Sequence, residues 1–245
     1  MMPCIPFVVH VLTIQSLNLH TYNQLQTKMR TKGAKGKFPT KNFILIEAFK
    51  LFASKQYDQV TFDDLESATK LSRGAILYHI KNKESLFSEV VENFVLNRLS
   101  ITQIYEEGLS LELLLSKFIQ FCREEKKKNK LNGIPNINMA ILNIESSAYS
   151  FYEDMKKKSQ EWHKSEQQTW TNVIKNAIKS GEIKKDVEIE LLSKLFEHIY
   201  SGVSYTGIIE PRGFSPDLLK KEFSFVYKSI KKEINVGGIK SNAIR

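Results

Sequence analysis

Cysteine is scarce in this sequence, with two residues, Cys4 and Cys122, among 245. Two thiols so far apart cannot build a disulfide framework, and they do not have the spacing of a zinc site. The small disulfide-rich secreted class is therefore excluded, and the composition suits a reducing cytosol. The five histidines are scattered without a metal-ligand pattern. We therefore expect neither a metal nor a cofactor.

Long apolar runs are also missing, since no stretch approaches the ~20 residues that a membrane-spanning helix needs. The apolar segment 5–14 has no Lys or Arg before it and no small-residue cleavage site after it. A signal peptide requires both features. We therefore expect a cytoplasmic protein that does not interact with a membrane. Residues 1–28 are either a poorly ordered extension or the product of an over-long start, with initiation at Met29.

Proline and glycine are few, at 6 and 11 residues, and apolar residues recur mostly at three- and four-residue spacing. This periodicity predicts an all-α protein. A hydrophobic content of 42% is sufficient for a packed core. The sequence lacks a nucleophile elbow, a phosphate-binding loop and a paired-cysteine metal site, so we expect that it is not an enzyme. Glu161, His163 and Glu166 are predicted to form a solvated helix face.

Positive charge exceeds negative charge, with 36 Lys and Arg against 27 Asp and Glu and a net charge of +9. Such an excess attracts polyanions, most often nucleic acid, although solubility alone accounts for it equally well. Residues 28–41 contain six cations and no acid. This segment is either a solvated tail or a basic arm that lies along DNA. Its position directly before the motif described next favours the arm.

The most informative local pattern lies at residues 61–80, where two short helices are predicted with a tight turn between them. Thr61 and Asp64 have the spacing of a capping box, which starts the first of these helices. Ser72 has a side chain suited to capping the second, which ends near residue 80. Two short helices in this arrangement form a helix-turn-helix. Flanking helices are predicted over 41–55 and from Asn82 onward.

The second of these helices has two different faces. Ile76, Leu77 and Ile80 share one arc, which we expect to be buried. The opposite side is polar or small and is free to face base edges and phosphates, while the long stem of Arg73 reaches outward from the first turn. The outward residues are Ser72, Gly74, Ala75, Tyr78 and His79.

The order of residues from 44 to 87 resembles the TetR family of bacterial repressors. The resemblance is carried by Leu71-Ser72-Arg73-Gly74-Ala75-Ile76 and His79-Ile80-Lys81-Asn82-Lys83-Glu84-Ser85-Leu86-Phe87, together with the apolar pattern of the preceding helices. Gly181-Glu182-Ile183-Lys184-Lys185-Asp186 and the apolar helix after it are similar to that family's effector domain. The resemblance implies an all-helical homodimer that binds a palindromic operator and is released by a small molecule.

The resemblance also implies which residues contact DNA. Those of the second helix would face the bases, whereas Thr61 and Lys83 at helix N-termini would meet phosphates. Thr61 and Ser72 could instead be caps alone, and His79 could be a solvated surface histidine. The complete set comprises Lys41, Thr61, Ser72, Arg73, Gly74, Ala75, Tyr78, His79 and Lys83.

Four positions depart from the family pattern. Gln56 and Lys70 stand where the family usually has glycine, at helix ends suited to left-handed geometry, and each departure costs roughly 1 kcal/mol. Leu77 replaces the usual tyrosine and removes a hydroxyl that would reach a phosphate. Glu66 stands where a small alanine is common.

Short breakers divide the rest of the chain into predicted helices over 111–128, 138–149, 151–180, 187–205 and 216–234. We expect four regions. They are a disordered basic extension (1–36), a helix-turn-helix DNA-binding domain (37–95), a helical effector-binding and dimerisation domain (96–236) and a disordered tail (237–245).

Two residue sets in the third region are candidates for function, although both could simply be core. The last two helices are apolar on more than one face, which predicts a four-helix homodimer interface formed by Leu192, Leu195, Phe196, Ile199, Phe223, Val226 and Ile230. Aromatic residues concentrate in the middle of the chain and could line a pocket for a small apolar ligand. They are Phe118, Phe121, Tyr149, Tyr152, Trp162 and Trp170.

The predicted function is a transcriptional regulator, more specifically a repressor, whose partners are a double-stranded DNA operator and an unidentified ligand. Two alternatives remain open at this stage. One is a basic nucleic-acid-binding protein without sequence preference or ligand control. The other is a ligand-binding helical protein with weakened DNA reading.

Overall fold

The computed structural model describes residues 41–98 and 100–232 of the chain. The predicted disordered segments 1–36 and 237–245, and the cations that precede Lys41, lie outside the described residues. Within the described ranges the chain is helical, and the pairing of Ile183 with Lys231 is an isolated bridge rather than a strand. The all-α prediction is confirmed. None of the described helices is both long and apolar enough to cross a membrane.

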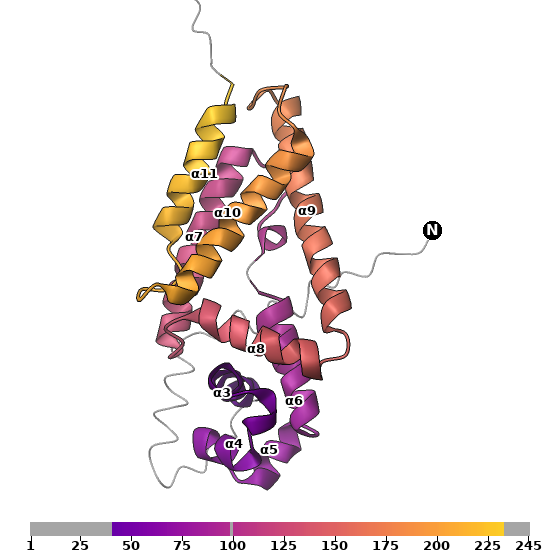
Figure 1. The fold of residues 1–245 in the computed structure, drawn as a ribbon, viewed down its shortest axis with the longest axis vertical. Helices are drawn as coiled ribbons and strands as arrows, with labels where there is room; N and C mark the ends of the chain where they lie inside the picture. The colour runs from indigo at the N-terminus through magenta and orange to yellow at the C-terminus, as the bar shows by residue number, and fades with distance from the viewer. Residues whose placement is uncertain (1–40, 99, 233–245) are drawn as a thin grey trace, which may run out of the picture.

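The helices form two groups, with one helix between them (Figure 1). The first four pack together at one end of the molecule: α3 (Lys41–Ser54), α4 (Phe62–Thr69), α5 (Arg73–His79) and α6 (Lys83–Val90). Across the middle lies α8 (Ile137–Phe151). The other end consists of α7 (Leu111–Leu131), α9 (Met155–Lys179), α10 (Ile189–Ile209) and α11 (Pro216–Ile230).

Side-chain caps determine where the short helices of the first group begin. The Thr61 hydroxyl accepts the Asp64 N–H at 3.2 Å, while the Asp64 carboxylate accepts the Thr61 N–H at 2.9 Å. Ser72 accepts the Ala75 N–H at the start of α5. Asn82 and Ser85 form a second capping box at the start of α6. These bonds satisfy amide groups that the first turn of a helix leaves free, so the predicted starts are confirmed.

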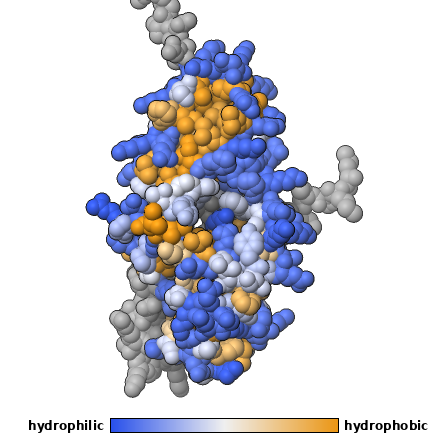
Figure 2. Space-filling model, viewed as in Figure 1, coloured by the Kyte–Doolittle hydropathy of each residue, from blue (hydrophilic) through white to orange (hydrophobic). Residues whose placement is uncertain are grey.

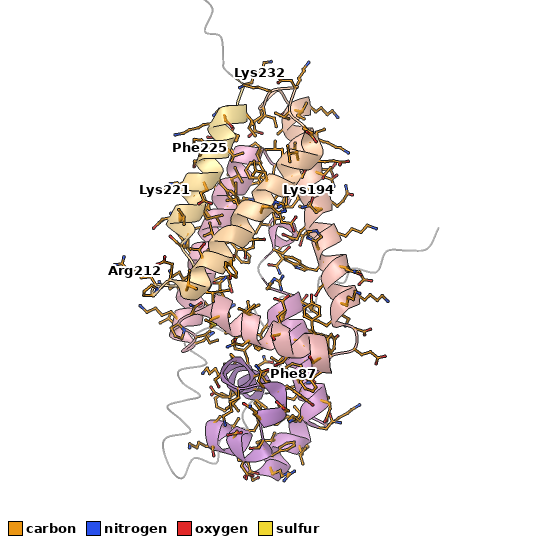
Figure 3. The ribbon with its side chains drawn as sticks, in the orientation of Figure 1. Phe87, Lys194, Arg212, Lys221, Phe225 and Lys232 are labelled. Atoms are coloured by element: carbon orange, nitrogen blue, oxygen red, sulfur yellow. The ribbon has the colours of Figure 1, made fainter. Side chains whose placement is uncertain are left out.

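An aromatic cluster anchors this group of helices. Phe87, on α6 (Figure 3), meets Phe52 edge-on with 4.9 Å between ring centroids and lies 4.7 Å from Tyr57. All three residues are buried, and each buried phenylalanine side chain contributes roughly 1.5–3 kcal/mol. Ile144 of α8 belongs to the same core. The first group is therefore continuous with α8 and does not end where α6 ends.

The segment after α6 connects the two ends of the molecule. It contains the π-helix η3 (Val91–Leu96), which continues α6 directly, and the 3-10 helix η4 (Ile101–Gln103). Glu92 of η3 accepts hydrogen bonds from the Tyr152 hydroxyl at 2.7 Å and the Lys158 ammonium at 2.6 Å. These bonds tie the connecting segment to the region between α8 and α9.

The second group has its own aromatic core, and a half-buried carboxylate, that of Glu182, holds three of its elements together. Trp170 stacks on Phe196 with 5.0 Å between ring centroids. The carboxylate of Glu182, in the turn after α9, accepts the N–H groups of Leu111 and Glu112 at 2.9 and 2.8 Å. The Tyr227 hydroxyl of α11 donates to the same carboxylate at 3.1 Å. One side chain therefore joins α7, the end of α9 and α11.

Several predicted helix boundaries are wrong. Helix α7 extends to Leu131 instead of 128, and α10 runs over Ile189–Ile209 instead of 187–205. Phe151, predicted to start a helix, ends α8 instead, and α9 begins at Met155. The last helix was predicted to reach 234, whereas α11 ends at Ile230. Lys231 is extended and takes part in the bridge to Ile183, which ends the helix.

Candidate DNA interface and ligand cavity

The turn before α5 requires left-handed backbone at one residue. Lys70 has φ 59° and ψ 26°, and its N–H donates to the Glu66 carbonyl at 2.8 Å. The prediction of left-handed geometry is confirmed for Lys70 and is wrong for Gln56. Gln56 is extended, with φ −59° and ψ 152°, because the chain enters the 3-10 helix η2 (Tyr57–Gln59) directly after it.

Helix α5 has a buried side and an exposed side. Ile76 and Ile80 are buried, as predicted. Leu77 is 40% exposed, so its predicted burial is wrong. The short α5 packs mainly through Ile76, and Leu77 falls at the edge of that contact. Tyr78 is 83% exposed and has no role in the core.

Several predicted contact residues lie on the exposed side of the helix-turn-helix. Thr61, Ser72, Arg73 and Gly74 are exposed, and Ala75 is half-buried. The guanidinium carbon of Arg73 lies 4.6 Å from the centroid of the Phe62 ring, which holds the stem along α4 and leaves the head exposed. Thr61 and Ser72 are both caps, which does not prevent contact with a phosphate.

His79 occupies a mixed environment at the end of α5. It is half-buried, and the edge of its ring meets Tyr78 with 5.2 Å between centroids. Its Nε2 atom is buried and has no hydrogen-bond partner among the described residues. Burial without a partner costs free energy, so His79 differs from the solvated histidine considered from the sequence.

The two lysines in the predicted set are held by contacts within the chain. The Lys83 ammonium donates to the carbonyls of Tyr57 and Val60 at 3.0 Å each and lies 4.4 Å from the Tyr57 ring centroid. The Lys83 ammonium is therefore occupied within the chain. A phosphate at this position would be bound by the backbone N–H groups at the start of α6 instead. Lys41 forms an ion pair with Glu89 at 2.7 Å. Such an exposed pair is weak and can exchange partners.

A cavity of about 370 Å³ lies between the two ends of the molecule. Its wall includes residues of η3, α7, α8, α9 and α10, and also Ile46 of α3. Figure 2 shows the surface hollowed above α8. Cys122 reaches this wall, and burial raises the pKa of its thiol to about 12. The thiol is therefore protonated near neutral pH.

Only two of the six aromatic residues predicted to line a pocket contribute to this cavity. Phe121 and Trp162 are part of its wall. Phe118 and Trp170 are buried in the second core instead. The remaining two are placed elsewhere: Tyr149 is exposed on α8, and Tyr152 packs against the first core. The apolar pattern of a single helix does not distinguish an aromatic residue of the cavity wall from one in the core or on the surface.

The cavity wall also contains two polar residues that no sequence pattern identifies. Arg98, which follows η3, and Glu145 of α8 both line it and form a 3.4 Å ion pair. They are 47 positions apart in the sequence, and neither belongs to a recognisable motif. Their proximity results from the packing of α8 against η3.

The first group of helices matches a known family model. The model described as "Bacterial regulatory proteins, tetR family" matches residues 44–90, which span α3 to α6. Residues 44–90 are therefore similar to the TetR family of bacterial regulatory proteins. The match confirms the resemblance seen in the sequence for this end of the chain, where α4 and α5 form the helix-turn-helix.

The chain is also similar to curated transcriptional regulators. The Staphylococcus epidermidis biofilm operon icaADBC HTH-type negative transcriptional regulator IcaR is 36% identical over 53 residues, which cover 22% of this chain and 29% of IcaR. The Escherichia coli probable acrEF/envCD operon repressor is 25% identical over 186 residues, 74% of this chain and 81% of that repressor. In the match to IcaR, the chain spans less than a third of that relative's length.

Solved structures agree on the fold. A TetR-family transcriptional regulator from Agrobacterium tumefaciens superposes with a TM-score of 0.58 at 12% identity, covering 78% of this chain and 97% of that one. The SmeT–triclosan complex gives a TM-score of 0.58 at 14% identity, covering 79% and 92%. These identities are low, so the likeness establishes the fold alone.

An apolar surface lies on the last two helices, α10 (Ile189–Ile209) and α11 (Pro216–Ile230). In Figure 2 apolar side chains gather over α10 and α11, at the end farthest from α4 and α5. Leu195 is exposed, and Ile199, Val226 and Ile230 are half-buried. The other three residues predicted at the dimer interface lie in the chain's own core: Leu192, Phe196 and Phe223. Exposed residues that the prediction missed are Leu191, Leu218 and Phe225.

Of the three residues predicted to form a solvated face of α9, Glu161 and His163 are exposed, and the prediction is wrong for Glu166. Glu166 is buried and accepts a hydrogen bond from the Ser100 hydroxyl, while burial raises the pKa of its carboxyl. His163 pairs with the buried Glu197 of α10 at 2.6 Å. Within residues 41–98 and 100–232, no cluster of three or more His, Cys, Asp and Glu side chains is placed to hold a metal ion.

Proposed function

We propose that this chain is a transcriptional repressor that binds a palindromic operator as a homodimer and leaves it when a small molecule occupies the central cavity. The DNA-binding domain comprises residues 37–95, and the effector-binding and dimerisation domain comprises residues 96–236. The single observation that carries the proposal is the exposed side of α5, which displays Arg73 and Tyr78 at one end of the molecule.

The shape of this end supports major-groove reading. A single α-helix fits the major groove of B-DNA, and α5 is short and bordered by capped helix starts. Residues at the N-terminal part of a recognition helix reach base edges. Arg73 and Gly74 occupy that part of α5. The caps at Thr61 and Asn82 mark helix N-termini that favour phosphates.

The apolar surface of α10 and α11 supports a homodimer. Phe225, labelled on α11 in Figure 3, is 77% exposed, and Leu191 and Leu195 of α10 are exposed as well. A contiguous apolar patch on a water-exposed surface marks an association site. Two copies joined through these helices would form a four-helix contact and present two α5 helices, as a palindrome requires.

The position of the cavity supports control by a ligand. Its volume of about 370 Å³ lies in the range of small-molecule sites. Ile46 of α3 and Asn97, next to η3, are part of the wall, so a ligand would contact both the DNA-binding end and the other helices. A ligand that fits only one arrangement of these elements shifts the population toward that arrangement.

Selection of bound sequences from a random DNA pool tests the DNA-reading part of the proposal. We expect an enriched palindrome that the full chain prefers over random DNA by ~10³-fold or more at physiological salt. The preference should persist as salt concentration rises, because base contacts do not depend on counterion release. Affinity that falls equally for all sequences would instead identify a non-specific nucleic-acid-binding protein.

A further inference from the structure

Arg98 lies in the cavity wall two residues after the end of η3, and only one of its three donor nitrogens forms hydrogen bonds with the described residues. Its guanidinium carbon lies over the Trp162 ring, 4.3 Å from the centroid. Both of its hydrogen bonds come from Nη1, to the Val95 carbonyl at 3.3 Å and to Glu145 at 3.4 Å. Among the described residues, its Nη2 and Nε atoms have no hydrogen-bond partner.

This arrangement leaves a fork of donors toward a ligand. The N–H groups of a guanidinium lie in its plane, so an aromatic ring that covers one face leaves the N–H groups at the edge accessible. Two neighbouring N–H groups in that plane match the two oxygens of a carboxylate. Glu145 competes weakly, because its contact with Arg98 is long and both side chains are about a quarter exposed.

The charges of the wall also favour an anion. Three cations line the cavity, Arg98, Lys126 and Lys128, against the two carboxylates of Glu125 and Glu145. Lys128 pairs with Glu125 at 3.3 Å. Lys126 donates to the carbonyls of Arg212 and Phe214 at 2.8 and 2.6 Å and has no carboxylate partner among the described residues. Burial lowers the pKa of Lys126, so a nearby anion would stabilise its charged form.

Much of the remaining wall is apolar. Phe121 of α7, Ile141 of α8 and Ile208 of α10 line it, together with Phe214 from the loop before α11. A purely polar ligand would leave this surface without partners. A ligand that fits both parts of the wall therefore combines an apolar body with one acidic group.

We propose that the cavity binds a hydrophobic carboxylate whose two oxygens accept hydrogen bonds from Nη2 and Nε of Arg98, with its apolar body against Phe121 and Ile208. This proposal rests on the proposed function and names the chemical class of its ligand. Binding would draw Arg98 away from Glu145. Arg98 lies two residues after η3, and η3 continues α6, so the ligand would act on the segment that leads to the DNA-binding end.

Isothermal titration calorimetry on the full chain tests this class directly. The probes share one ten-carbon chain: decanoate and decyltrimethylammonium, each below its micelle concentration, and 1-decanol below its solubility limit in water. A parallel pair, 2-naphthoate and 2-naphthol, distinguishes a ring from a chain as the apolar body. We expect a carboxylate of either pair to bind about tenfold or more tightly than its alcohol, and the ammonium to bind more weakly than both.

Two variants and a matched control assign the contact. Arg98→Gln should weaken carboxylate binding about tenfold and change alcohol binding less than about twofold. Lys128→Gln removes the same charge from the same wall and should change carboxylate binding less than about threefold. Glu145→Gln should tighten it, because the competing carboxylate is removed. Circular dichroism confirms that each variant is folded.

Three outcomes would overturn the proposal. The carboxylate and the alcohol could bind equally tightly, or no probe could bind up to ~1 mM. The third outcome is that the unaltered chain binds the ammonium most tightly and that Glu145→Gln abolishes this binding. None of these measurements involves DNA. Failure here would therefore leave the operator selection unaffected, and failure of that selection would leave the ligand result unaffected.

Discussion

Arg73 of α5 lies over the ring of Phe62 of α4, with its guanidinium carbon 4.6 Å from the ring centroid. The two residues are the first of their helices, so the contact joins both halves of the helix-turn-helix. Arg73 has no carboxylate partner among the described residues. Its in-plane donors are therefore available to a base edge, for which the N7 and O6 atoms of guanine are the best match.

Replacing Arg73 with alanine should relax operator preference. The expected cost is ~1–3 kcal/mol at the contacted base pair, with a smaller loss on random DNA. Fluorescence anisotropy with the selected operator and its single-base variants measures this. Arg73→Lys keeps the positive charge but lacks the pair of parallel N–H donors. At that base pair it should lose about as much discrimination as Arg73→Ala. Unchanged operator affinity in both variants would contradict the assignment of α5.

Replacing Tyr78 with alanine should weaken operator binding without affecting stability. Tyr78 is 83% exposed, so its removal creates no cavity. Tyr149→Ala is the matched control, because Tyr149 is also an exposed tyrosine but lies on α8. We expect equal melting temperatures for the two variants and weaker DNA binding for Tyr78→Ala alone. Equal DNA affinity would remove Tyr78 from the interface.

Glycine at position 70 should stabilise the protein, and glycine at position 56 should not. Lys70 is left-handed at φ 59°, where a side chain costs roughly 1 kcal/mol that glycine avoids. Gln56 has an ordinary φ of −59°, and its side chain accepts a hydrogen bond from Ser147 at 3.0 Å. Urea unfolding should therefore show a gain for Lys70→Gly and a loss for Gln56→Gly. A loss in both variants would refute the strain at Lys70.

Lowering the pH should reduce the free energy of unfolding, because Asp64 becomes protonated. Its hydrogen bonds, first to Lys55 and then to Thr61, lower the pKa of its carboxyl from 3.8 to about 2. A carboxyl with a lowered pKa in the folded state adds stability above pH 3.8, which is lost as the pH falls toward 2. Asp64→Asn should flatten the fall in melting temperature over this range. Asp63→Asn, in the same helix turn, is the control and should retain the slope.

A charge in the apolar surface of α11 should separate the dimer. Phe225→Glu places a carboxylate at a position that is 77% exposed in the single chain, so the fold of each subunit should survive. Sedimentation equilibrium at micromolar concentration should show monomers for this variant and dimers for the unaltered chain. Tyr149→Glu, on an exposed site of α8, should remain dimeric. A monomeric unaltered chain would end the dimer proposal.

The sequence predicts the first group of helices well because its signals are local. The caps at Thr61, Ser72 and Asn82 act within three residues of themselves, so spacing alone identifies them. Gln56 was mispredicted because its backbone depends on the path of the chain into η2. Several backbone conformations can follow a helix end, and the packing of the rest of the chain determines which one is adopted.

The second group of helices is less predictable because neighbouring apolar positions have different destinations. Phe118 lies in the core, whereas Phe121, three residues later, faces the cavity. In the same way Phe196 is buried and Leu195 is exposed. Both faces of these helices are apolar, so the periodicity identifies helices without showing which side meets the chain and which meets a ligand or a second copy.

The hydrogen bonds of Glu182 have a consequence for the order of folding during synthesis. The first amide groups of α7 are bound by a side chain that the ribosome adds about 70 residues later. Helix α7 therefore emerges long before its start can be secured, whereas the caps of α4, α5 and α6 lie within a few residues of the groups they bind. Non-local contacts form slowly. The first group of helices should thus form first, and the second group, which contains the apolar surface and much of the cavity wall, should be completed only near the end of translation.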